Sequence, residues 1–325
     1  MDGMISTQRL KTILERQAST AWGTDYQPAI RATPQEAPRM SRPSTIISNL
    51  MQREIHLMSL GERSAAFLAL YNQRVFDLQE QRVLFTGPWP HPLHGHPNAM
   101  GLDLPAFKGT INVAERLNCL SQHPTVMFKP VQEDPDTWKR VPYPYLGDLL
   151  LFINDDQGPF CINWTVKKDE EDFKKFRLGR RSNPNRETAD QEKAARRHKV
   201  EEIYHQDVGI RTVQVTSSAI PARLAANLNR LFGWHNRKLK ISESQQSELL
   251  RWYQTEMQKR TPPIRLLSPM MQKLGCSRED CLGVLYQGIW KRELRVDLFH
   301  PILVDHPLCP EMKDALVEFA HWFGR

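Results

Sequence analysis

The chain has 325 residues, of which 40% are hydrophobic and 25% charged, so it is long enough for two domains with ordinary cores. It contains no run of about 18 apolar residues, and its N-terminal residues are charged, so we expect neither a membrane-spanning helix nor a secretory signal. The five cysteines are scattered and odd in number, which favours reduced thiols in a cytoplasmic protein. Cys276 and Cys281 lie close together, but no second ligand pair for zinc is near them.

The net charge of +7 is concentrated in one segment. Residues 174–199 hold ten basic and three acidic residues, which accounts for the whole excess. Local basic concentrations attract phosphate backbones, and a solvated helix face is the alternative interpretation. Because the segment directly follows a predicted strand at 160–167 that ends in a lysine, we expect DNA-backbone contacts in this region, from Lys168, Lys174, Lys175, Arg177, Arg180 and Arg181.

The first part of the chain is expected to lead into a folded domain. Residues 1–45 are polar and rich in proline, which predicts an N-terminal extension with one short helix near 8–16. Ser59 and Glu62 match a capping box that begins a helix, and residues 74–85 predict a strand with a candidate break near Gln79 and Glu80. A proline-rich loop follows at 86–105, and we do not expect its histidines to bind a metal.

The next part predicts an α/β domain over residues 46–217. A short helix is expected at 110–121, with extended pieces at 123–133 and 139–145. Two strands, 146–153 and 160–167, are joined by the turn at 154–158, whose residues tolerate left-handed backbone. A helix at 187–205 and an alternating strand at 210–216 complete a mixed sheet flanked by helices.

From residue 218 to 325 we expect a mostly helical C-terminal domain. Helices are predicted at 221–232, 242–259, 269–274 and 278–287, and residues 289–298 alternate like a strand pair or strand edge. Helices followed by a hairpin are typical of a winged-helix domain, and a loose helical bundle is the alternative. Residues 230–240 interleave aromatic and basic side chains, which suits phosphate or partner contact and equally suits a helix end with Phe232 and Trp234 in a core.

One acid and one lysine stand out on the paired strands. Asp148 is the only carboxylate of an apolar strand, and burying it demands a charged partner or a divalent metal. On the next strand, Asn163, Thr165 and Lys167 share one face, which we expect to point toward Asp148. Two carboxylates that hold Mg²⁺, with a lysine near the phosphate, are a minimal set for phosphodiester hydrolysis. This is the layout of the PD-(D/E)xK nuclease core.

Glu62 is the candidate for the second carboxylate. Its alternative role is to complete the capping box with Ser59 and nothing more. Likewise, Asp148 and Lys167 can form a buried ion pair that is purely structural in many folds.

The order of these segments resembles the TnsA-type endonuclease subunit of heteromeric, Tn-seven-like transposases. The similar segments read SLGERSAAFLALYNQRVFDLQEQ at 59–81, YPYLGDLLLFI at 143–153 and CINWTVK at 161–167. The D-[IL]-x-E-Q strand of that family is met at 77–81, and VEEIY at 200–204 also resembles it. The similarity spans roughly residues 55–230.

The resemblance implies a restriction-endonuclease-like catalytic domain at 46–217 and a winged-helix domain at 218–325. Such proteins cut the 5′, non-transferred strands at transposon ends, while a DDE-type partner, TnsB, acts on the 3′ ends and an AAA+ ATPase, TnsC, controls the complex. The implied setting is double-stranded DNA in the bacterial cytoplasm, at the nucleoid. Carried over, Glu62 and Asp148 become ligands of Mg²⁺, which Mn²⁺ can replace, and Lys167 polarises the scissile phosphate or orients the water.

The sequence departs from the family pattern at Thr165, where glutamine is common. A threonine hydroxyl is shorter, so as a metal ligand Thr165 would act through water. Lys168 follows Lys167, so the register decides which lysine enters the site. Two alternatives to the transposase subunit stay open: a stand-alone restriction or repair nuclease, and a DNA-binding scaffold subunit with an inactive nuclease site.

Overall fold

The structure is a computed structural model that describes residues 7–38, 41–128, 138–174 and 184–325, with residues 128 and 184–189 as backbone only. The chain divides into two compact units. The first unit comprises Met1–Arg63, Arg74–Ser217 and Arg325, and the second comprises Ser64–Gln73 and Ser218–Gly324. Helix α2 (Leu60–Tyr71) therefore contributes its first turn to the first unit and its remainder to the second.

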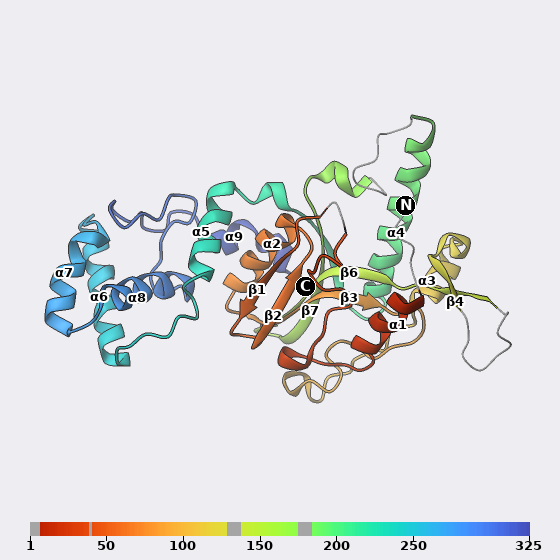
Figure 1. Ribbon diagram of the computed structural model, residues 1–325, viewed down its shortest axis with the longest axis horizontal. Coiled ribbons are helices and arrows are strands. Elements are labelled where there is room, and N and C mark those ends of the chain that lie inside the picture. The colour runs from red at the N-terminus through yellow and green to blue at the C-terminus, as the bar shows by residue number, and fades with distance from the viewer. Residues whose placement is uncertain (1–6, 39–40, 129–137, 175–183) are drawn as a thin grey trace. The chain divides into compact units, whose positions relative to one another are not determined.

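A mixed sheet organises the first unit. Its strands lie in the order β3 (Val75–Leu84), β6 (Tyr145–Asp155), β7 (Gly158–Lys167) and β8 (Arg211–Thr216) (Figure 1). The β3–β6 and β6–β7 pairs are antiparallel, and β7 and β8 are parallel. Parallel neighbours need a crossover, which helix α4 (Pro184–Gln206) supplies. The prediction of an α/β fold with a mixed sheet flanked by helices is confirmed.

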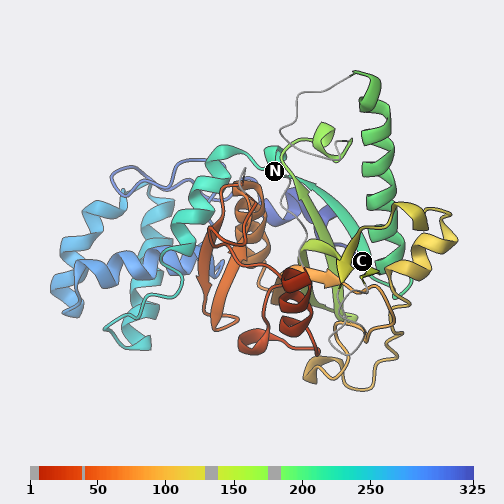
Figure 2. The same ribbon diagram turned by 45° about the vertical axis from the view of Figure 1, so that its right-hand side comes forward.

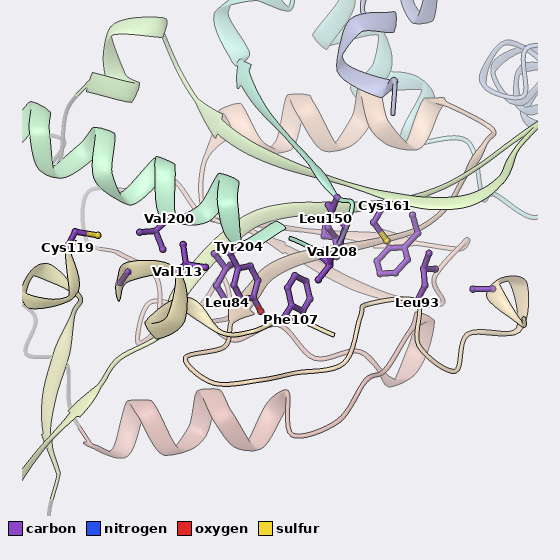
Figure 3. Close-up of a cluster of buried hydrophobic side chains, with 14 residues drawn as sticks. Leu84, Leu93, Phe107, Val113, Cys119, Leu150, Cys161, Val200, Tyr204 and Val208 are labelled. Carbon is purple, nitrogen blue, oxygen red and sulfur yellow. The ribbon is translucent and has the colours of Figure 1, made fainter. Parts of the chain in front are cut away.

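A hydrophobic cluster joins the sheet to α4 and α3 (Thr110–Arg116), as Figure 3 shows. Leu150 of β6 meets Val200 and Tyr204 of α4 in this cluster. The ring of Tyr204 stacks on Phe107, with centroids 4.2 Å apart. This packing fixes α4 against one face of the sheet. The helix lies alongside the sheet in both views (Figure 1 and Figure 2).

Helix α1 (Thr7–Arg16) belongs to the first unit and is not a detached extension. It buries Leu10 and Ile13 in a second cluster with Val83 of β3 and Val126. Val126 lies on β4 (Thr125–Phe128), which pairs with β5 (Lys139–Pro142) as an antiparallel ribbon. The sequence predicts the helix itself, but its docking depends on apolar partners more than 70 residues away in the chain, such as Val83.

The hairpin of β1 (Ser44–Ser48) and β2 (Arg53–Leu57) precedes α2 and packs near β3. The candidate break in β3 is wrong, because the strand runs through Gln79 and Glu80. Both side chains are fully buried with partners: the Gln79 amide donates to the Ala21 carbonyl at 2.8 Å, and Glu80 accepts from Arg53. The irregular register lies earlier in the strand, between Val75 and Asp77.

The second unit is helical. Helix α8 (Arg278–Trp290) is its centre and contacts α5 (Ala222–Phe232), α6 (Glu243–Gln258) and α7 (Pro263–Leu274); two short helices follow, α9 (Ala315–Glu318) and α10 (Ala320–Phe323). Capping boxes at Ser242 and Ser277 begin α6 and α8. The α7 helix starts six residues before the expected Pro269, because Pro263 occupies its first turn. Phe232 lies in the core against Phe67, with ring centroids 4.9 Å apart.

The strand expected at 289–298 is wrong. Helix α8 continues through Trp290, and over residues 218–325, all of them described, the only β-pairing is the isolated bridge between Val296 and Pro310. Leu294, Val296 and Leu298 are buried, as the apolar positions of the predicted strand would be. They lie on an extended segment that follows the end of α8, where Arg292 has a φ of 63°. The winged-helix hairpin is therefore absent from this stretch. Across the described residues, no helix has the length and apolar character needed to cross a bilayer.

Candidate active site

Asp148 and Lys167 form an ion pair at the end of two neighbouring strands. The register pairs Leu149 with Trp164, which places Asp148 beside the C-terminal end of β7. The Lys167 Nζ lies 3.6 Å from Asp148 Oδ2, and the backbone N–H of Val166 donates to the same oxygen at 2.7 Å. Both side chains are about four-fifths buried, with 20% and 17% exposed. The structure thus brings together the acid and the lysine that the sequence indicated.

Lys167, and not Lys168, is the lysine that approaches Asp148. The side chain of Lys168 is 82% exposed and pairs with Asp169 at 3.6 Å. This follows from the two-residue period of a strand, because Lys167 shares its face with Asn163 and Thr165.

Glu62 is buried in the first turn of α2 and is held by several donors. Its Oε2 accepts from the Met58 N–H at 2.8 Å and from the Gln81 amide at 3.1 Å, and its Oε1 accepts from the Ser59 hydroxyl at 3.1 Å. The Ser59 hydroxyl also accepts from the Glu62 N–H at 3.0 Å. The capping interaction expected from the sequence is therefore present, and it does not use the full acceptor capacity of the carboxylate.

The charges of the three groups act on one another. Burial, and then the negative charge of Asp148, raise the pKa of Glu62 to about 8. The hydrogen bonds from Met58 and Ser59 and the positive charge of Lys167 lower the pKa of Glu62 but do not cancel the rise. Glu62, Asp148 and Lys167 therefore form one electrostatic site, assembled from α2, β6 and β7.

We expect Glu62 to make the stability of the protein depend on pH. Its pKa rises from an ordinary 4.5 to about 8 on folding, so the folded state binds the proton more tightly. The stabilisation is therefore complete below the unfolded pKa and is lost as the pH rises through the folded pKa. Glu62→Gln should flatten the fall of the urea midpoint between about pH 5 and pH 8, whereas the exposed Glu15→Gln should not. Parallel profiles for wild type and Glu62→Gln would contradict this assignment.

Glu201 of α4 is a second buried carboxylate that the sequence interpretation did not select. Its Oε1 accepts from the Asn163 amide and from the Thr165 hydroxyl, each at 2.9 Å. Thr165 thus shares the predicted face with Asn163, and its hydroxyl proton is directed to Glu201. The role of Thr165 as a metal ligand through a water molecule stays a prediction.

A signal for Glu201 exists in the sequence. Ala194, His198, Glu201 and His205 recur at intervals of four, three and four residues, the spacing of one helix face. Ala194, Glu201 and His205 are buried in the structure. A polar residue on a buried stripe is expected to face a polar partner, and here that partner is β7.

The Asp77-Leu-Gln-Glu-Gln81 strand is mainly structural. Asp77 accepts from the backbone N–H groups of Gly23 and Leu78, and Glu80 pairs with Arg53. Of the motif's side chains, Gln81 is the one that donates to Glu62.

The predicted DNA-contacting residues lie mostly outside the described part of the chain. Lys168 and Lys174 are exposed, and Lys174 pairs with Glu171 at 2.8 Å. The other four lie outside the described residues: Lys175, Arg177, Arg180 and Arg181.

The donor set suits Mg²⁺ better than a transition metal. Among the described residues, no group of three or more His, Cys, Asp or Glu side chains could hold a metal ion. Mg²⁺ is commonly bound by one or two carboxylates and keeps several waters. Glu62 and Asp148 supply two, and Asp148 Oδ1 makes no hydrogen bond to any described residue.

No protein-family model matches the chain, and no curated protein matches its sequence.

Proposed function

We propose that the first unit is a Mg²⁺-dependent DNA endonuclease. The observation that carries the proposal is the ion pair of Asp148 and Lys167, 3.6 Å apart and about four-fifths buried, with the buried Glu62 close enough for the charge of Asp148 to raise its pKa. Carboxylates brought together in a partly buried place are stabilised by a bound divalent cation. A lysine at the same place supplies positive charge for a phosphate.

Glu62 and Asp148 would hold the ion, and Asp148 Oδ2 already accepts from the Val166 N–H and faces Lys167. When bound, Mg²⁺ supplies Lewis-acid stabilisation and lowers the pKa of a bound water. The protein's own contribution is orientation: Ser59, Met58 and Gln81 fix the Glu62 carboxylate through hydrogen bonds.

Lys167 is positioned to neutralise charge on the attacked phosphate. Its ammonium lies 3.6 Å from Asp148 and donates to the Val166 carbonyl at 3.2 Å, so the side chain is held in place before DNA binds. Preorganised positive charge is worth more in such a water-poor site than in solution.

The finer proposal is that the chain is the subunit that cuts the 5′, non-transferred strands within a heteromeric transposase. It is supported by the resemblance of residues 55–230 to TnsA-type endonucleases, and a mixed sheet flanked by helices is compatible with a restriction-endonuclease-like domain. Under this proposal the partners are transposon-end DNA, TnsB and TnsC, in the bacterial cytoplasm.

Metal binding tests the site directly. Calorimetric titration of the full chain with Mn²⁺ should show one binding event in wild type that Asp148→Asn and Glu62→Gln each weaken at least about tenfold, with proton release on binding. Asp156→Asn, on the same hairpin with 94% of the side chain exposed, is the matched control and should bind like wild type. Absence of binding by wild type would favour the inactive scaffold.

A DNA-cutting assay tests whether the chain acts within a transposase complex. With DNA carrying transposon ends and Mg²⁺, we expect 5′-strand cuts that require the transposase partners. Cutting by the purified chain alone would favour a stand-alone restriction or repair nuclease.

A further inference from the structure

His198 lies on the face of α4 that looks toward the candidate site. It precedes Glu201 by three residues, so the two share a helix face and are about 4.5 Å apart along the axis. Because α4 connects the parallel strands β7 and β8, it runs back along β7 in the opposite direction. Moving along α4 from Glu201 toward the start of the helix therefore corresponds to moving along β7 from Thr165 toward Lys167.

The electrostatic environment of His198 agrees with this placement. Burial lowers the pKa of His198, Glu201 and Asp148 raise it, and Lys167 and Arg197 lower it further. The imidazole therefore interacts electrostatically with both Asp148 and Lys167, the acid and the lysine of the site. Its ring packs on Phe173, with centroids 5.6 Å apart, and its nitrogens make no hydrogen bond to any described residue.

A cavity of about 740 Å³ opens in front of His198. It lies between α4, β8 and the 3-10 helix η4 (Glu170–Lys174), and Thr216 on its wall is paired with Lys167 in the β7–β8 register. A volume of this size accepts a ligand as large as a nucleotide. The cavity therefore borders the lysine end of β7, where the attacked phosphate would lie.

We propose that His198 is a catalytic base of the hydrolysis, a role that rests on the proposed nuclease function. The oxygen of a water forms a bond to phosphorus, and one proton of that water passes to an imidazole nitrogen of His198. The bond from phosphorus to one esterified oxygen breaks, and that oxygen leaves with the electron pair and takes a proton from solvent. The imidazolium then returns its proton to solvent, so no further reactant is needed.

Other charged groups around His198 bear on its pH dependence. Those on the strands are Asp148 and Lys167. Those on α4 are Arg197, Glu201, the mutually paired Lys199 and Glu202, and Glu192, which pairs with Arg196. From η4, Glu170 and Lys174 line the same cavity.

The placement can be tested without any activity. In the full chain labelled with ¹³C at histidine Cε1, the resonance that His198→Asn removes should titrate below the ordinary pKa of a histidine side chain. Lys167→Ala should raise the pKa of that resonance and Asp148→Asn should lower it, while the exposed Lys108→Ala should leave it unchanged. If neither Lys167→Ala nor Asp148→Asn changed the pKa of the His198 resonance, the geometric basis of the inference would be lost.

The chemical role needs a pH–rate profile. In the assembled complex at saturating Mg²⁺ and DNA, His198→Asn should lower single-turnover cutting by about 100-fold or more and abolish the acid limb due to the imidazole. His94→Asn should retain the wild-type rate and profile. If wild type and His198→Asn cut with the same rate and pH profile, the role of His198 is contradicted and the nuclease function is not. If wild type does not cut, both the nuclease function and the role of His198 are contradicted.

Discussion

Asp148→Ala and Lys167→Ala should each abolish 5′-strand cutting while the protein still folds and assembles. Lys167 places a positive charge 3.6 Å from Asp148, and loss of one preorganised electrostatic group commonly lowers the rate about 100- to 1,000-fold. Asp148→Ala removes the proposed metal-ligand oxygen and the partner of Lys167 together, so its effect should be at least as large. The measurement is single-turnover cleavage at saturating DNA and Mg²⁺, with circular dichroism to establish that the variants are folded.

Two other lysines separate a role in chemistry from a role in binding. Lys168→Ala removes an exposed cation, so it should raise the DNA concentration needed for half-maximal rate without changing the rate at saturation. Lys108→Ala, exposed and outside the site, should match wild type. Retention of cutting by Asp148→Ala, or equal effects of Lys167→Ala and Lys168→Ala at saturation, would contradict the assignment of Lys167 to the active site.

The part of the site on β6 and β7 could be predicted because it is local. Two apolar runs joined by a short turn pair with each other, and the two-residue period then decides which side chains share a face. Asp148 and Lys167 needed no information beyond this hairpin, and the structure places their charged groups 3.6 Å apart. Glu62 was suggested by its helix position, but its proximity to Asp148 depends on how α2 meets the sheet.

The part of the site on α4 could not be found in the same way. The charged character of α4 suggested a solvated or DNA-binding helix, and the side chains that matter, His198 and Glu201, are a minority on one face. Their importance depends on the crossover that lays α4 along β7. The same holds for Gln79 and Glu80 of β3, whose polar side chains suggested a break although they are buried, because Ala21 and Arg53 reach them from earlier segments.

The alternation of apolar and polar residues at 289–298 gave a wrong strand prediction in the second unit. Residues 289–298 alternate because Trp290, Leu294, Val296 and Leu298 all turn inward. A helix end followed by an extended segment gives the same pattern as a strand when the stretch is short.

Arg53→Met should produce the largest loss of stability among the substitutions considered. Arg53 makes two hydrogen bonds of 2.9 Å to the two carboxylate oxygens of Glu80, and their side chains are 7% and 0% exposed. Removing one partner of a buried pair leaves an uncompensated charge and typically costs about 3–5 kcal/mol. The free energy of unfolding, measured by urea titration, should fall by that amount, whereas Lys11→Met, from an exposed pair with Glu15, should change it by less than about 1 kcal/mol.

The double variant Arg53→Met, Glu80→Met distinguishes the cost of a buried unpaired charge from the loss of packing. With both charges gone, the desolvation penalty of Glu80 disappears, so the double variant should be more stable than Arg53→Met alone. It should remain below wild type, because the His56 N–H loses the Glu80 oxygen that accepts from it at 2.9 Å. If the two substitutions were additive, Glu80 would not depend on Arg53 for its burial. Additivity would also remove the explanation for a continuous β3, on which the position of Gln81 beside Glu62 depends.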